Sequence, residues 1–166
     1  LAEMEAMIDG TLDFLRGEVL SEAIKPLDLV PLLSTICSDL SDTGHDVDLQ
    51  AARPCVIRGR RLALKRALTN LIDNAVKYGN RACVTLSGMQ GSAEIRIEDQ
   101  GPGIPEEEIG AVLRPFYRLE TSRNKETGGV GLGLSVAHAI ISSHGGALRL
   151  ENGPEKGLIV SVTLPR

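Results

Sequence analysis

The sequence predicts an α+β domain in which one layer of three helices packs on a mixed, mostly antiparallel sheet of about five or more strands. Some segments space hydrophobic residues as a helix does, and others alternate hydrophobic and polar residues as a strand does. Glycine-containing turns join two pairs of the strand-like segments into hairpins. The length of 166 residues leaves room for one compact core and a short additional segment.

The composition is that of an ordinary globular domain and argues against several functions. Hydrophobic residues make up 42% and charged residues 24%, so neither a wholly disordered chain nor a membrane protein fits. The net charge of −4 and the scarcity of aromatic residues (2 Phe, 2 Tyr, no Trp) argue against a nucleic-acid partner. The 3 cysteines are far apart and form no CxxC pair, which favours a reducing cytoplasm over a disulfide framework or a zinc site.

A helix is expected over residues 1–18, because hydrophobic residues recur there at helical spacing at Leu1, Met4, Ile8, Leu12 and Leu15. The pattern starts at the first residue with no capping residue before it. Both the end of a longer helix and an amphipathic helix docked on its own domain fit this pattern.

The first half of the remaining chain contains short strands around one helix. In order, we expect a strand over 22–27, a helix over about 30–40, and strands over 47–51 and 55–58. Pro26 confines the first strand to an edge or a strand end. Asp28 is placed to cap the helix, which tolerates Pro31 in its first turn.

The second half contains two helices and two hairpins. In order, we expect a helix over about 61–78, a hairpin over 81–99, an irregular stretch over 100–130 with a brief helix near 106–112, a helix over about 133–143 and a final hairpin over 148–164. Irregular stretches as long as 100–130 inside a compact domain are usually lids or binding loops.

A polar stripe runs along the helix over 61–78. Asn70, Asn74 and Lys77 lie at helical offsets 0, +4 and +7, which places them on one side of the helix. Amide oxygens and a cation suit a hydrated hard metal ion and phosphate oxygens. A solvated edge of an amphipathic helix is the alternative.

Asp99 ends a strand whose inward face carries Ala93, Ile95 and Ile97, so the alternation points its carboxylate inward. A buried carboxylate needs hydrogen-bond donors. Gly101 and Gly103 follow it, where a backbone or a ligand can approach closely. Asp99 could accept a hydrogen bond from an exocyclic amine, or it could stabilise a local turn through its own side chain.

A glycine-rich run, Gly128-Gly129-Val130-Gly131-Leu132-Gly133-Leu134-Ser135, leads into the helix over 133–143. Free N–H groups at a helix N-terminus form an anion site. The run matches neither the GxGxxG pattern nor the P-loop pattern GxxxxGK[ST]. A flexible hinge is the other interpretation, and the two are compatible.

Four segments occur in one order: TNLIDNAVKYG, EDQGPGI, RPFYRLE and GGVGLGLS. In this order they resemble the N box, first glycine box, F box and second glycine box of the ATP-binding catalytic domain of sensor histidine kinases. That family shares the Bergerat fold with gyrase B, Hsp90 and MutL. The resemblance covers about residues 22–166 and extends through AHAIISSHGGALRL and LIVSVTLPR.

The resemblance implies that the domain binds ATP with Mg²⁺. Asn74 would be the Mg²⁺ ligand, and Asn70 would support the metal or the phosphates from the preceding turn. Lys77 would face the phosphates, and Tyr78 the nucleoside.

On the base side, Asp99 would accept a hydrogen bond from the adenine amine, beside a loop formed by Gly101, Gly103 and Ile104. Phe116, Tyr117 and Arg118 would belong to the F box, with Arg118 near the γ-phosphate. Residues 119–127 would form a lid over the nucleotide. Gly128, Gly129, Gly131 and Gly133 would form its hinge, with their amides meeting the phosphates. Val130 and Leu132, within the same run, would also belong to the nucleotide site.

The phosphoacceptor histidine of such kinases is normally followed by an acidic residue and an Arg-Thr-Pro-like stretch. None of His45, His138 and His144 has that context, so no catalytic residue is assigned with certainty. Residues 1–20 would then be the end of a dimerisation helix with a hinge, and residues 21–166 the catalytic domain. The implied partners are the phosphoacceptor helix of the same kinase, a response-regulator receiver domain and a second copy of the kinase. The domain would be cytoplasmic, in a parent protein anchored in the bacterial inner membrane.

Two other functions belong to different classes. One is a Bergerat-fold ATPase of the gyrase, MutL or Hsp90 type, and the other is a nucleotide-binding regulator or serine kinase of the anti-sigma type. The ATPases generally carry a glutamate as general base where this chain has Asn70, which cannot abstract a proton. The hydrophobic seam of residues 1–15 favours the sensor kinase over both.

Overall fold

The computed structural model of the chain describes residues 17, 20–51, 53–114 and 133–166. Its elements are β1 (Lys25–Asp28), α2 (Leu29–Asp42), β2 (Asp46–Gln50), β3 (Val56–Gly59), α3 (Arg61–Gly79), β4 (Arg81–Met89), β5 (Ser92–Asp99), a 3-10 helix (Glu106–Glu108), α4 (Gly133–Ser143), β6 (Ala147–Asn152) and β7 (Leu158–Pro165). Of the N-terminal helix expected over 1–18, residues 1–16 and 18 lie outside this description.

Five of the strands form one sheet in the order β2-β4-β5-β7-β6. The β2–β4 pair is parallel and the other three pairs are antiparallel. The prediction of a mixed, mostly antiparallel sheet is therefore confirmed. The strands β1 and β3 form a separate two-stranded antiparallel sheet, in which Pro26 lies opposite Arg58. Every strand of a two-stranded sheet is an edge strand, which is where a proline is tolerated.

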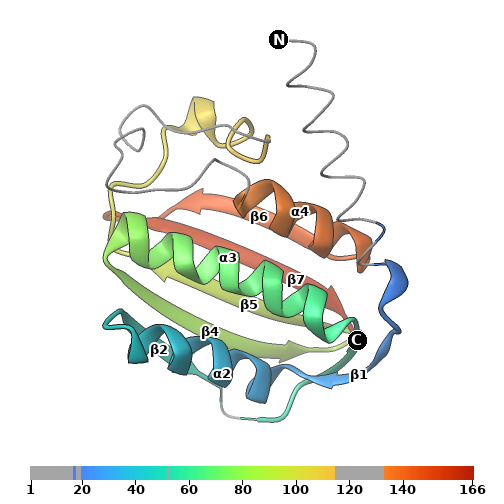
Figure 1. Cartoon of the computed structure of the whole chain (residues 1–166). Coiled ribbons are helices and arrows are strands. Elements are labelled where there is room, and N and C mark those ends of the chain that lie inside the picture. The colour runs from blue at the N-terminus through green and yellow to red at the C-terminus, as the bar shows by residue number, and fades with distance from the viewer. Residues whose placement is uncertain (1–16, 18–19, 52, 115–132) are drawn as a thin grey trace.

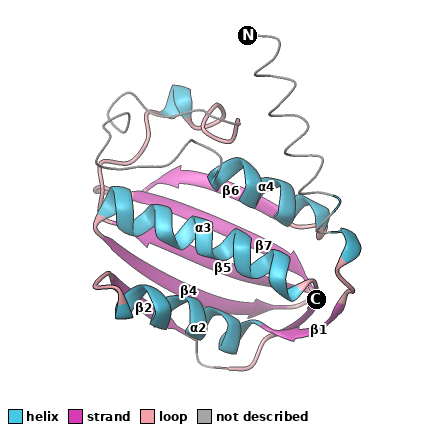
Figure 2. Ribbon diagram, viewed as in Figure 1, coloured by secondary structure: helices cyan, strands magenta, loops and turns pink. Residues whose placement is uncertain are grey.

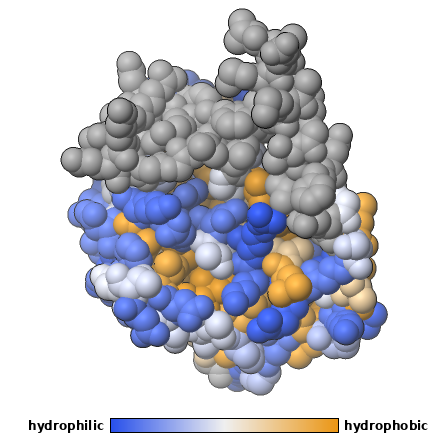
Figure 3. All heavy atoms as spheres, viewed as in Figure 1, coloured by the Kyte–Doolittle hydropathy of each residue, from blue (hydrophilic) through white to orange (hydrophobic). Residues whose placement is uncertain are grey.

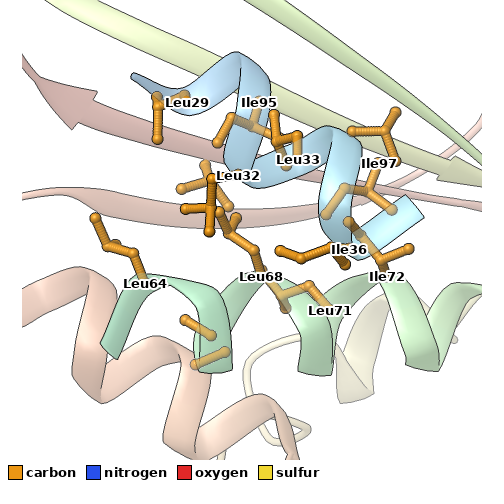
Figure 4. Close-up of a cluster of buried hydrophobic side chains, with 14 of the residues drawn as sticks. Leu29, Leu32, Leu33, Ile36, Leu64, Leu68, Leu71, Ile72, Ile95 and Ile97 are labelled. Atoms are coloured by element: carbon orange, nitrogen blue, oxygen red, sulfur yellow. The ribbon is translucent and has the colours of Figure 1, made fainter. Parts of the chain in front are cut away.

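The three long helices cover one face of the five-stranded sheet, with α3 lying between α2 and α4 (Figures 1 and 2). This arrangement agrees with the expected helix layer. Side chains of α3 meet those of α2 over the isoleucines of β5, as Figure 4 shows. The residues labelled there are all essentially buried: Leu29, Leu32, Leu33, Ile36, Leu64, Leu68, Leu71, Ile72, Ile95 and Ile97. Full burial of each such side chain is worth about 1.5–3 kcal/mol, so this cluster holds α3 on the sheet.

Asp28 caps α2 as the sequence predicts. Its Oδ1 accepts hydrogen bonds from the N–H groups of Val30, at 3.1 Å, and of Cys55, at 3.2 Å. The first bond satisfies a free donor of the helix N-terminus, and the second ties the start of the helix to the segment before β3.

Several details differ from the sequence expectation. The strand expected over 22–27 is limited to Lys25–Asp28. The brief helix expected near 106–112 is a three-residue 3-10 helix, Glu106–Glu108, followed by turns. Three successive like charges and Gly110 disfavour an α-helix there, and short segments of this kind often adopt the 3-10 form. The helix expected over 61–78 continues to Gly79 and ends at Asn80, which has the left-handed φ of 63°.

The surface seen in Figure 3 has patches of hydrophobic side chains among hydrophilic ones. In the described part of the chain, the large hydrophobic residues classed as exposed are Leu20, Ile24, Val56, Leu62, Tyr78 and Met89. Within the same part of the chain, none of the helices combines the length and the hydrophobicity needed to span a bilayer.

Candidate nucleotide-binding site

The amide edge of α3, formed by Asn70 and Asn74, lies beside the first residue of α4. Both asparagines are half-buried. Nδ2 of Asn70 lies 3.4 Å from the carbonyl oxygen of Gly133, to which it donates a long hydrogen bond. A Cβ atom built on Gly133 would lie 3.6 Å from Nδ2 of Asn74. The structure thus brings together two side chains and a helix N-terminus that are about 60 residues apart in the sequence.

Lys77 and Tyr78 lie further along α3 and are more exposed. The ammonium group of Lys77 forms an ion pair with Asp73 at 2.9 Å, one helical turn before it. Tyr78 is 37% exposed. To reach a ligand at the amide edge, Lys77 would first have to leave Asp73.

Asp99 ends β5, and its carboxylate is half-buried. Its Oδ1 accepts hydrogen bonds from the N–H groups of Gly101, at 2.9 Å, and Leu158, at 3.0 Å. The first bond is the local turn that the sequence offered as an alternative. Within the described residues no hydrogen bond to Oδ2 is found, so this oxygen can accept one from a ligand. The turn therefore uses only one of the two oxygens of this side chain.

The pKa of the Asp99 carboxyl is raised, because burial disfavours the charged form. The two backbone N–H groups lower this pKa, but by less than burial raises it. A carboxylate that is only partly compensated by its own protein gains more from an added donor than a fully solvated one does. An exocyclic amine is such a donor.

The loop after Asp99 is attached to the C-terminal end of α3. The N–H of Gln100 donates to the carbonyl oxygen of Gly79 at 3.2 Å. Gly101 fits against the same helix end, where a Cβ atom would lie 2.6 Å from the carbonyl oxygen of Tyr78. The close approach expected at Gly101 is therefore made by the protein backbone. This end of α3 and the loop come together at the left of Figure 1.

The two halves of the site are separated along α3. The amide edge begins at Asn70, and Asp99 packs beside Gly79 at the helix end. Nine residues of α-helix span about 14 Å. The helix α3 thus carries the amide edge, and its end packs against a glycine-containing loop and the carboxylate of Asp99.

Three residues near Asp99 were not identified from the sequence. Gly157 approaches the carbonyl oxygen of Asp99 so closely that a Cβ atom there would overlap it. Leu158 donates to Asp99, and Asn152 holds the backbone of Ile104. All three belong to the final hairpin, for which the sequence predicts a turn over residues 153–157 (GPEKG) and a strand from Leu158 onward. The two glycines of GPEKG were the only signal, and they do not say which segment the turn packs on.

Some of the predicted site residues lie outside the described residues. These are Phe116, Tyr117 and Arg118 of the F-box segment and Gly128, Gly129, Val130, Gly131 and Leu132 of the glycine-rich run. Their roles remain predictions. Gly133 is described, and Ile104 is described and 8% exposed.

The donors at the amide edge fit a hard metal ion that also binds phosphate. Among the described residues, no three His, Cys, Asp or Glu side chains form a group able to hold a metal. The half-buried amide oxygens of Asn70 and Asn74 are neutral oxygen donors. Mg²⁺ is commonly bound by one or two protein groups together with substrate phosphates and water, and neutral amides suit that role.

Comparison with known proteins identifies the family of this chain. Residues 59–166 match the family described as histidine kinase-, DNA gyrase B-, and HSP90-like ATPase. The chain is 38% identical over 167 residues to the sensor histidine kinase GtrS of Pseudomonas aeruginosa, covering 100% of this chain and 34% of GtrS. The chain thus spans about a third of the length of that relative.

Solved structures show the same fold. The mycobacterial sensor histidine kinase MprB superposes with a TM-score of 0.75 at 29% identity, covering 86% of this chain and 97% of that one. The ATP binding domain of PrrB from Mycobacterium tuberculosis superposes with a TM-score of 0.72 at 30% identity, covering 87% and 98%. The Bergerat fold expected from the four sequence segments is confirmed. The chain belongs to the histidine kinase-, DNA gyrase B-, and HSP90-like ATPase family, with sensor histidine kinases as its relatives.

Proposed function

We propose that this chain is the catalytic core of a two-component sensor histidine kinase. It binds ATP with Mg²⁺ and transfers the γ-phosphoryl group to a histidine outside this chain, from which the group passes to an aspartate of a response regulator. The observation that carries the proposal is the contact of the Asn70–Asn74 edge with Gly133 at the start of α4. That contact places two amide side chains, whose oxygens are neutral metal donors, beside a helix N-terminus, which suits a metal-bound triphosphate.

Asp99 recognises the base in this proposal. Its Oδ1 already accepts two backbone N–H groups, so Oδ2 is the oxygen that would accept a hydrogen bond from the adenine amine. Guanine carries a carbonyl oxygen at the corresponding position, and a carboxylate repels it. The half-buried carboxylate therefore selects adenine.

Asn74 and Asn70 would hold the metal and its water shell, and Gly133 with the residues before it would meet the phosphates. When bound, Mg²⁺ neutralises phosphate charge. The residues of the chain position the triphosphate, and phosphoryl transfer needs little more from a protein than positioning and electrostatic stabilisation. The bond from the γ-phosphorus to the leaving ADP oxygen breaks, and a phosphorus–nitrogen bond to the acceptor imidazole forms. The imidazole then loses its ring proton to solvent.

Transfer to an external nucleophile fits this chain better than hydrolysis. An ATPase of this family needs a base that abstracts a proton from water, and the amide of Asn70 cannot do so. The relatives named above are sensor kinases, whereas gyrase, MutL and chaperone ATPases share only the broader family. We therefore expect the isolated chain to bind ATP and to hydrolyse it slowly.

The rest of the kinase is proposed from the relatives. Residues 1–20 would be the end of a dimerisation helix and its hinge, and residues 21–166 the catalytic domain. The full protein would be a homodimer anchored in the bacterial inner membrane, with this domain in the cytoplasm. Its partners would be its own phosphoacceptor helix and a receiver domain.

The test is a phosphotransfer assay with radiolabelled ATP. The chain is mixed with a dimeric helical peptide that carries the phosphoacceptor histidine of a related kinase. We expect labelled peptide whose phosphate is lost in acid and kept in alkali. The matched control replaces the peptide histidine by glutamine. Acid-stable label, or label that persists in the control peptide, would contradict histidine transfer.

A further inference from the structure

The final hairpin turn holds both ends of the segment from Asp99 to Ile104. At one end, the amide of Asn152 pairs with the backbone of Ile104: its Oδ1 accepts from the Ile104 N–H at 2.8 Å, and its Nδ2 donates to the Ile104 carbonyl at 2.6 Å. A side chain that satisfies both backbone groups of one residue acts as a strand partner would. Asn152 lies at the surface, whereas Ile104 is buried, so the bonds anchor the loop to the hairpin.

Gly103 shows how tightly Asn152 fits this loop. Its φ is +75°, in the left-handed region that favours glycine. A Cβ atom at Gly103 would overlap Oδ1 of Asn152. Any other residue at 103 would therefore be strained and would also displace the asparagine.

The other end of the same turn lies on Asp99. The turn is closed by a hydrogen bond from the N–H of Gly153 to the carbonyl oxygen of Gly157, at 2.9 Å. Gly157, with φ +86°, packs directly on the backbone of Asp99, and the next residue, Leu158, donates to the Asp99 carboxylate at 3.0 Å. One five-residue turn thus holds the carboxylate and, through Asn152, the loop that follows it.

We propose that Asn152 is a positioning residue for adenine recognition. It acts through the backbone of Ile104 and Gly103, and it fixes the loop that lies beside the base-binding oxygen of Asp99. This inference rests on the proposed function, because it assigns a role in the binding of the nucleotide base. Replacement of Asn152 releases the loop at its Ile104 end, while the amide edge of α3 and Gly133, at the other part of the site, stay as they are.

The proposal predicts a base-specific loss of affinity. In Asn152→Leu, which keeps the size but forms neither hydrogen bond, we expect the affinity for ATP to fall about fivefold. The affinity for GTP, which does not use the amine contact, stays within about twofold of wild type. Asn152→Ser can form one of the two hydrogen bonds through its hydroxyl. We expect its affinity for ATP to lie between those of wild type and Asn152→Leu. Glu151→Ala, an exposed neighbour on β6, is the matched control and leaves both affinities unchanged.

The experiment is isothermal titration calorimetry of the full chain with ATP and with GTP, together with melting temperatures of all variants. An ATP affinity in Asn152→Leu equal to wild type would overturn the proposal, as would an equal loss for ATP and GTP. If Asn152→Leu does not fold, Asn152→Ser decides by the same criteria. If the wild-type chain itself binds no ATP, the proposed function fails rather than the role of Asn152.

Discussion

At the scale of single residues, the site depends on how each oxygen of Asp99 is used. Two backbone donors occupy Oδ1, and in the proposed site Oδ2 would accept the hydrogen bond from adenine. A neutral amide at this position keeps its oxygen on those donors and turns its NH₂ group toward the adenine amine. Two donors then face each other.

Asp99→Asn therefore weakens ATP binding through a specific mismatch. We expect a loss of tenfold or more in affinity, since a hydrogen bond to a charged acceptor is worth about 1.5–3 kcal/mol. Calorimetric titration with ATP measures it, and circular dichroism checks that the fold is kept. An unchanged affinity would remove Asp99 from the site.

The raised pKa of Asp99 also has a consequence for the nucleotide-free protein. Because burial raises the native pKa above the unfolded value of about 4, the native state keeps this proton to higher pH than the unfolded state does. Stability contributed by the protonated group is present below the unfolded pKa and is lost as the pH rises through the native pKa. We expect wild type to lose stability relative to Asp99→Asn as the pH rises from about 4 toward neutrality. Urea denaturation of both proteins across this pH range measures the difference in their free energies of unfolding. If wild type instead became more stable relative to Asp99→Asn as the pH rises, the native pKa of Asp99 would be lowered rather than raised.

Asn74→Ala tests the metal role. Without the amide oxygen, we expect ATP affinity in Mg²⁺ to fall to the value measured without Mg²⁺, while the melting temperature changes little because the side chain is only half-buried. Thr69→Ala, on the same helix but off the amide edge, is the control. Titrations with ATP in the presence and absence of Mg²⁺ measure this effect. An Asn74→Ala variant whose ATP affinity still depends on Mg²⁺ as in wild type would contradict the proposed role.

At the scale of elements, α3 is capped by a residue from a distant segment. The carboxylate of Glu22 accepts hydrogen bonds from the N–H groups of Leu62, at 2.8 Å, and Ala63, at 3.0 Å. Nε of Arg60 donates to the carbonyl oxygen of Glu22 at 2.9 Å, and the Arg60 N–H donates to Nε2 of His144. The start of α3, the end of α4 and the segment before β1 are thereby joined. His144 thus has a structural contact, in agreement with its lack of phosphoacceptor context.

Glu22→Ala removes this cap. We expect the free energy of unfolding to fall by about 1 kcal/mol, as for other lost N-caps. Glu22→Gln, which keeps an acceptor but loses the favourable charge at the helix N-terminus, should lose less. Urea denaturation compares these variants with Glu155→Ala, an exposed glutamate in the final turn. A Glu22→Ala protein as stable as Glu155→Ala would show that the cap contributes nothing.

At the scale of the whole molecule, the sequence predicts most of the fold, because its elements are locally encoded. The alternation around Ile95 and Ile97 and the helical period from Leu64 to Ile72 are strong local patterns, and the structure follows both. The separate β1–β3 sheet was not foreseen, since residues about 30 apart pair there with no local signal. Likewise, the spacing of hydrophobic residues does not predict the 3-10 helix at Glu106–Glu108, which depends on the residues around it.

The candidate site was predictable only in part. Asn70, Asn74 and Asp99 can be found from a helical face and a strand face, and the family segments place them in order. Their surroundings depend on tertiary contacts. Glu22, Asn152 and Gly157 act on segments 40 or more residues away, so neither periodicity nor turn composition identifies their partners. Such contacts can be identified only from the folded structure.

The central claim is that one ATP molecule binds along α3, with its base at Asp99 and its phosphates at Asn70 and Asn74. The most direct test is titration of the isotope-labelled chain with ATP and Mg²⁺, followed by nuclear magnetic resonance of backbone and asparagine side-chain amides. We predict saturable shifts of the amides of residues 99–104, of the Asn70 and Asn74 side chains, and of Gly133. Adenosine alone should shift only the first group. Shifts confined to other parts of the sheet, or none at saturating ATP, would contradict the account.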